Sequence, residues 1–289
     1  MPRLPITKTP KPYVGGAFIR SESGRSFPVA DAKGEFFANI PQCTRKDLRN
    51  AVEAAAKAGP GWAKRTAYNR GQILYRLGEM LESRREDLIA TLVCFGDTRA
   101  AATKEVDAAT DRLIYYAGWA DKYEQVLGNV NPVASPHFNF TVTEPMGILG
   151  VIAPEAPALL GLVSLFAPVI VSGNTVVALA SEKTPYPAIL LGEMLATSDL
   201  PGGVVSILTG FRKEILPTFA THAHLRAISA AGVSAEERKA LRLGAAESVK
   251  RVRFAEAEKT ADWLSDRAQS LYAIRDCLEF KTTWHPIGA

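Results

Sequence analysis

The sequence predicts an α/β protein with a parallel, doubly wound sheet and a layer of helices before it. Two changes of pattern predict this fold class. Apolar residues recur at helical spacing from about residue 44 to residue 123. From Gly147 onward, short apolar strands alternate with helices. Five strands with intervening helices imply right-handed crossovers, and such sheets bind ligands at the carboxyl ends of their strands.

The helical layer is expected to begin at Thr44, three residues before Asp47, in a pattern typical of a capping box. We expect Gly59-Pro60-Gly61 to stop this first helix. Three further helices are predicted at 67–83, 84–95 and 101–123. The preceding residues 1–37 are rich in proline and glycine, so we expect extended arms and turns there.

The sheet strands are predicted at 148–153, 175–179, 204–208, 227–230 and 249–254. The helices between them are predicted at 158–171, 185–198, 213–222 and 235–246. After Lys259 we expect one amphipathic helix that reaches about Cys277. Two further segments alternate apolar and polar residues as strands do, at 138–143 and 279–285.

Composition excludes several function classes. The 289 residues carry a formal charge of +4, too small an excess for nucleic acid to be the main partner. The three cysteines form no CxxC pair and no metal-ligand spacing, which predicts no metal site and fits a reducing cytoplasm. Prolines stand where a signal peptide would need an apolar run. We therefore expect a cytoplasmic protein without a membrane partner.

One uncharged segment, 156–181, is long enough to be mistaken for a membrane span. Pro157, Pro168 and the Gly173-Asn174 turn divide it into pieces shorter than the roughly 20 residues that a span needs. A buried helix followed by a buried strand is the better interpretation.

Four segments resemble the aldehyde dehydrogenase superfamily and occur in that family's order. EVDAATDRLIYYAGWADK at 105–122 resembles the long helix before the family's oligomerisation hairpin. EPMGILGVIAP at 144–154, SGNTVV at 172–177 and LPGGVVSILTG at 200–210 resemble its first three nucleotide-domain strands. The resemblance implies a Rossmann-like cofactor domain over 1–125 and 147–277, with an oligomerisation hairpin at 126–146 that is completed by a C-terminal strand at 278–289.

The resemblance also implies an NAD(P)-dependent ancestor that oxidised aldehydes to acids through a cysteine thiolate. The family carries this cysteine in a Gly-Gln-x-Cys motif within a separate domain that should follow Lys259. Only about 20 residues separate Lys259 from the C-terminal strand, and they contain no such motif. The catalytic domain is therefore predicted to be absent. Cys277 is interpreted as a plain helix thiol, with a displaced nucleophile as the alternative.

Two further catalytic positions differ from the family pattern. Ala156 stands where an asparagine amide would stabilise the oxyanion, and losing such a donor costs about 10²–10³ in rate. Ala255 stands where a glutamate would activate water. Glu256 is displaced by one residue, which places it on the other face of a strand unless a bulge restores it. We predict no catalytic residue.

The positions that correspond to cofactor contacts in the family are expected to be vestigial; they are Ile152, Ala153, Pro154, Glu182, Gly210 and Gly232. Leu179 replaces the lysine that would share the adenosine ribose with Glu182. Arg212 follows Gly210 and Phe211 where the family keeps a glycine, although Arg212 and Lys213 could alternatively attract phosphate. We expect either no cofactor or weakly bound NAD(P).

Three functions follow from this pattern. The first is a catalytically inactive subunit that assembles with a full-length aldehyde dehydrogenase paralogue, with self-association as an alternative. The second is an NAD(P)-dependent aldehyde oxidoreductase whose site is completed across an interface. The third is an NAD(P)-binding sensor. The intact packing pattern favours the first, because unselected decay would damage the core as readily as the site.

Overall fold

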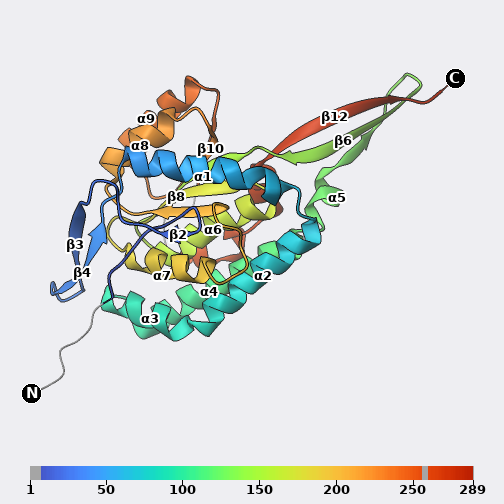
Figure 1. The fold of residues 1–289 in the computed structure, drawn as a ribbon. Helices are drawn as coiled ribbons and strands as arrows, with labels where there is room; N and C mark the ends of the chain where they lie inside the picture. The colour runs from blue at the N-terminus through green and yellow to red at the C-terminus, as the bar shows by residue number, and fades with distance from the viewer. Residues whose placement is uncertain (1–7, 256–259, 289) are drawn as a thin grey trace, which may run out of the picture.

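The computed structural model describes residues 8–255 and 260–288. Within those residues the body is a seven-stranded sheet (Figure 1). Its strands lie in the order β11 (Arg251–Phe254), β10 (Leu225–Ala230), β7 (Ile148–Ile152), β8 (Thr175–Leu179), β9 (Val205–Leu208), β1 (Tyr13–Val14) and β2 (Ala17–Phe18). From β11 to β9 all pairs are parallel, whereas β1 pairs antiparallel with β9 and with β2. The predicted doubly wound sheet is confirmed.

Helices cover both faces of this sheet. The face beneath β7 to β9 is covered by α6 (Ala158–Val171) and α7 (Tyr186–Leu195). The opposite face is covered by α1 (Arg45–Ala63), α8 (Arg212–Thr221) and α9 (Ala235–Ala246). Outside α6 and α7 lies the helical layer of α2 (Ala67–Ser83), α3 (Arg85–Cys94) and α4 (Arg99–Trp119) (Figure 1).

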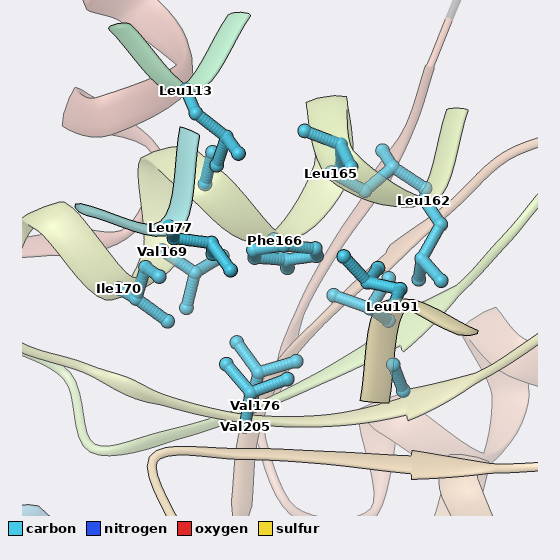
Figure 2. Packing of buried hydrophobic residues seen from close by; sticks show 14 of the residues in the cluster. Leu77, Leu113, Leu162, Leu165, Phe166, Val169, Ile170, Val176, Leu191 and Val205 are labelled. Carbon is cyan, nitrogen blue, oxygen red and sulfur yellow. The ribbon is translucent and has the colours of Figure 1, made fainter. Parts of the chain in front are cut away.

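Helix α6 is the centre of the larger hydrophobic core. Every one of its residues is buried, as expected of a helix that is apolar on all sides. Figure 2 shows Phe166 of α6 between the sheet residues Val176 and Val205 on one side and Leu77 and Leu113 of the helical layer on the other. The predicted buried helix followed by a buried strand is therefore confirmed. No helix in the described part of the chain is long and apolar enough to cross a membrane.

The first helix does not stop where the sequence predicts. It continues through Gly59-Pro60-Gly61 to Ala63. Tertiary packing overrides the breaker residues, because Trp62 in the last turn is fully buried and its indole Nε1 donates to the backbone oxygen of Ile170 at 2.9 Å. The Thr44–Asp47 capping box at the other end is confirmed.

The N-terminal segment before α1 also contains more regular secondary structure than predicted. Besides β1 and β2, it forms the hairpin of β3 (Ser26–Ala30) and β4 (Phe36–Pro41). The hairpin buries its own small cluster, which includes Phe27 and Ile40.

The single helix predicted between Lys259 and Cys277 is wrong. The described residues there form three short helices instead: α10 (Thr260–Leu264), η1 (Asp266–Ala268) and α11 (Leu271–Arg275). Buried Arg112 of α4 donates to the backbone oxygens of Trp263 and Ala268 at 2.9 and 2.8 Å. In a continuous helix these carbonyls would accept from backbone N–H groups of the next turn. Here they accept from the Arg112 guanidinium instead, which explains why the helix is interrupted.

A three-stranded sheet, here called the arm, projects from the body (Figure 1). It follows α5 (Tyr123–Leu127) and has the order β12 (Leu278–Pro286), β6 (His137–Pro145) and β5 (Asn129–Asn131). The strands expected at 138–143 and 279–285 are thus confirmed and pair antiparallel. Asn174 holds the root of the arm: its Oδ1 accepts from the Gly147 amide and its Nδ2 donates to the Cys277 carbonyl, both at 2.7 Å.

Candidate functional site

The residues predicted to contact a cofactor gather at the carboxyl edge of the parallel sheet. Ile152 ends β7, and the others directly follow a strand end: Ala153 and Pro154 after β7, Glu182 after β8, Gly210 after β9 and Gly232 after β10. The ends of β7 and β10 approach closely, since a Cβ on Gly232 would lie 3.2 Å from the Cα of Pro154. Gly232 also has φ +58°, a conformation that favours glycine.

The side chain of Arg212, the first residue of α8, lies across this edge. Its Nη1 donates to the carbonyl of Gly232 at 2.8 Å, and its Nη2 donates to the carbonyl of Ala153. Nη2 also lies 3.1 Å from Oε1 of Glu155. Arg212 is buried, with 7% of its surface exposed. One guanidinium therefore joins the ends of β7 and β10.

Glu155 joins this arrangement to the end of β8. Its Oε2 accepts from the hydroxyl of Ser181 at 2.7 Å and from the Lys183 amide at 2.9 Å. Its Oε1 faces Arg212. Both carboxylate oxygens are thus engaged by donors from this chain.

Glu182 is engaged as well. Its Oε2 accepts from the backbone N–H of Arg212 at 3.0 Å. This amide is one of the free N–H groups at the start of α8 that would otherwise attract an anion. The Glu182 carboxylate therefore occupies the place at this helix start where an external anion would bind. We call Glu155, Glu182 and Arg212 the edge network.

The structure shows where the three positions interpreted as replacements lie. Leu179 is fully buried in the cluster beneath α1, together with Val177 and Leu208. Ala156 is exposed after the end of β7. Ala255 follows β11, and its amide donates to the Ala230 carbonyl at 2.9 Å. Glu256 lies outside the described residues.

Neither buried thiol is prepared for nucleophilic attack. Burial raises the pKa of Cys277 to about 12 and that of Cys43 to about 12, so both are protonated at neutral pH. Cys277 lies in the turn between α11 and β12 rather than inside the predicted helix, and its Sγ donates to the Ala273 carbonyl. A groove of about 870 Å³ opens beside Ala255, but no cysteine or histidine is among its described lining residues.

The sequence pattern of the aldehyde dehydrogenase family matches residues 18–277. Retinal dehydrogenase 2 of Gallus gallus is 34% identical over 275 residues, which cover 92% of this chain and 52% of that protein. An aldehyde dehydrogenase of Alternaria alternata is 32% identical over 245 residues, covering 83% of this chain and 48% of that protein. This chain belongs to the aldehyde dehydrogenase family. It spans about half the length of the curated relatives it matches.

Solved aldehyde dehydrogenase structures have the same fold. Betaine aldehyde dehydrogenase of Staphylococcus aureus, solved in complex with NAD⁺, superposes with a TM-score of 0.81 at 23% identity, covering 85% of this chain and 50% of that one. The NAD⁺ complex of aldehyde dehydrogenase from Bacillus cereus gives a TM-score of 0.81 at 24% identity, with 86% and 50% covered. The Rossmann-like fold predicted from the resemblance is confirmed.

The residues at the carboxyl edge fit a family cofactor poorly. The phosphates of NAD(P) need free N–H donors at a helix start. Here the Arg212 amide is bonded to Glu182, and the Arg212 guanidinium is turned onto backbone carbonyls and Glu155. Two acidic side chains, Glu155 and Glu182, therefore lie at the start of α8, and their charge opposes the binding of a dianionic pyrophosphate at this helix start. No cluster in the described ranges 8–255 and 260–288 is suited to a metal ion.

The edge network is the feature that sequence analysis missed. Glu155 directly precedes Ala156, and Arg212 stands where the resemblance leads us to expect a glycine, but the sequence shows each of them alone. Their opposite charges at two strand ends were the available signal. Pairing such positions requires knowing that the start of α8, after β9, reaches the end of β7, although β8 lies between β7 and β9 in the sheet.

Proposed function

We propose that this chain is a non-catalytic subunit that assembles, through the arm, with a complete NAD(P)-dependent aldehyde dehydrogenase. The observation that carries the proposal is the arm itself. Its strands are paired in full register along β6 and β12. Its two outer strands, β5 and β12, have no further strand beside them in the described chain.

Both faces of the arm carry large apolar side chains that are exposed or half-buried. Cross-strand partners lie on the same face, so the register places Phe280 and Trp284 of β12 on one face and Phe138, Phe140 and Val142 of β6 on the other. Trp284 is 57% exposed and Phe138 is 45% exposed. Exposed apolar surface and open strand edges are the features by which one chain extends the sheet of another.

The proposed partner is a complete enzyme because a second copy lacks what the arm needs. In the family that this chain resembles, the arm strand of one subunit extends the catalytic-domain sheet of its neighbour. Here the described residues between β11 and β12, which are 255 and 260–277, form short helices and no strand. A full-length paralogue would provide an acceptor sheet for the arm.

Absence of turnover in the isolated chain is the second half of the proposal. Ala156 and Ala255 supply neither an oxyanion donor nor a general base. The buried thiols are protonated at neutral pH. Three of the predicted cofactor positions are already bonded to Arg212, through the Glu182 carboxylate and the carbonyls of Ala153 and Gly232.

Co-expression with each full-length aldehyde dehydrogenase from the same genome tests the assembly. We expect one such enzyme to co-elute with this chain in size-exclusion chromatography. Changing Trp284→Ser and Phe138→Ser should abolish co-elution. The matched control is Tyr75→Ser on α2, which removes a similarly exposed aromatic side chain from the helical layer instead of the arm. Failure of every pair to co-elute would overturn the proposal.

Activity of the purified chain tests the second half. We expect no NADH formation from aliphatic or aromatic aldehydes with NAD⁺ or NADP⁺. Steady turnover by the isolated protein would instead establish an active dehydrogenase, and turnover that appears only in a complex and is lost with Ala255→Asp would place a site across the interface.

A further inference from the structure

We propose that a groove at the open edge of β11 binds an extended acidic segment of a partner protein, which joins the sheet as an added strand. The groove has a volume of about 860 Å³ and is lined by Arg238, Arg242, Arg251, Arg253 and Arg275. We call it the arginine groove. Phe280, at the root of the arm, also lines this groove. The inference nevertheless goes beyond the proposed function, because it concerns the open edge of β11 and does not require the partner to be an aldehyde dehydrogenase.

The floor of the arginine groove is a free strand edge. Within the described residues β11 pairs with β10 alone and ends the seven-stranded sheet. The Ala255 amide donates to Ala230 of β10, so alternate residues Arg251 and Arg253 also turn their backbone groups toward β10. The backbone N–H and C=O of Val252 and Phe254 therefore point outward, ready to pair with an incoming strand.

Arginines stand on both sides of this edge. Val252 and Phe254 pack toward α9, where Arg238 and Arg242 lie over the ring of Phe254 at 5.0 and 5.2 Å. Arg251 and Arg253 point to the opposite face of the sheet, where Arg275 of α11 also lines the groove. Successive side chains of an added strand alternate between the two faces. Acidic residues at every position would then meet a guanidinium.

The charge in the groove is only partly compensated. Asp276 lies 3.2 Å from Arg253 and 3.6 Å from Arg275, and Glu279 lies 2.8 Å from Arg251. Arg238 and Arg242 have no carboxylate partner among the described residues and contact an aromatic ring instead. They are four residues apart on one helix, an arrangement in which like charges repel until an anion binds between them.

Charge also excludes a second copy as the occupant. A two-fold contact through this face would bring five arginines against five arginines, with only two carboxylates on each side. Such a contact is repulsive. A partner of opposite charge is required, and the exposed backbone of β11 selects an extended chain over a compact anion.

Fluorescence anisotropy with fluorescein-labelled hexaglutamate tests the proposal on the whole chain. We expect saturable binding that weakens as salt rises, because the contacts are ionic. The double variant Arg238→Gln and Arg242→Gln should weaken binding about tenfold. The variant Lys239→Gln removes one charge from the same helix but outside the groove, and it should bind as the parent does.

Further peptides and variants test whether the bound segment adds to the sheet as a strand. Hexaglutamate methylated at alternate backbone nitrogens keeps its charge but loses strand donors, so it should bind at least about tenfold more weakly. Equal binding of that peptide, equal binding by the Gln double variant, or tighter binding of single-stranded hexathymidylate would overturn the proposal. The variant Arg238→Lys with Arg242→Lys keeps both charges and should retain binding, which separates loss of charge from loss of folding. Trp284→Ser should leave peptide binding unchanged, so this result and arm-mediated assembly can fail independently.

Discussion

Arg212 occupies the hydrogen-bonding groups at the ends of two sheet strands. It donates to the carbonyls that end β7 and β10 and pairs with Glu155, so it replaces free donors with internal bonds. Buried charges of this kind are stable only when their partners are all present. The edge network is consequently a unit whose members should depend on one another.

A double-mutant cycle measures this dependence. We expect Arg212→Met to lower the free energy of unfolding by about 3 kcal/mol, because it leaves Glu155 and two buried carbonyls without their donor. Glu155→Gln should cost less, since its side chain is partly exposed and keeps amide and hydroxyl partners. In urea titrations the double variant should lose less than the two single losses combined. Additivity within about 0.5 kcal/mol would contradict a shared network.

Glu105 is another buried carboxyl, and its titration makes the free energy of unfolding depend on pH. Its Oε1 accepts from the amides of Leu159 and Leu160 at 2.8 and 3.2 Å, at the start of α6. Burial raises its pKa, against the lowering effect of the two amides. The folded chain then holds this proton more tightly than the unfolded chain. As pH rises from the ordinary glutamate range through the raised pKa, the proton is released and the free energy of unfolding falls.

Glu105→Gln removes this titration while keeping an acceptor oxygen for both amides. We expect the variant to match or fall below the parent near pH 4 and to gain stability relative to it as pH rises to 7. Urea unfolding at several pH values measures the difference between the two proteins. A constant difference across the range would show that Glu105 does not titrate in the folded state.

At the scale of elements, close approach between β7 and α8 is fixed by a glycine. A Cβ on Gly150 would lie 2.7 Å from Cδ1 of Phe219 and 3.1 Å from its Cε1. Gly150→Ala would therefore push α8 away from the sheet, and we expect a loss of about 1–3 kcal/mol in unfolding free energy.

Gly118→Ala is the matched control for this change. Gly118 lies inside α4, and a Cβ added there would meet no neighbouring side chain or packed element within 4 Å. Replacing a helical glycine with alanine should raise stability by about 0.5–1 kcal/mol. Thermal or urea unfolding that showed equal effects at the two positions would contradict the packing argument.

The sequence predicted those elements whose own pattern determines them. The bounds of α2, α6, α9 and β8 agree with the prediction because their apolar spacing and flanking residues are local signals. The two-residue strands β1 and β2 were missed, since Tyr13 is held by pairing with Ile207 of β9 and not by any alternation of its own. The division of 260–277 depends in the same way on Arg112, which is distant in sequence.

The candidate site was predicted only in part, for the same reason. The residues at the strand ends could be placed because parallel topology brings all carboxyl ends to one edge. The contact between Glu155 and Arg212 could not be placed, because it depends on the directions of two side chains, one after β7 and one at the start of α8. Local departures from a family pattern show where a site has changed, whereas the new contacts require the folded chain.

At the scale of the whole molecule, the edge network predicts the response to nucleotides. A ligand present at 100 times its Kd would stabilise the folded chain by about 2.7 kcal/mol, which raises Tm by several degrees. We expect millimolar NAD⁺ or NADP⁺ to leave Tm within about 1 °C of the free protein. A larger rise that is lost in Glu182→Ala would mean that the edge opens and binds the cofactor.

Asn174 links the two connections between the arm and the body. Its single amide group bonds the chain where β6 leads into the body and the chain where β12 leaves it. The arm consequently has two anchored roots instead of one flexible tether. A subunit that binds the tip of the arm would therefore hold the body in a more defined orientation, through a buried amide that lies outside the contact between the two subunits.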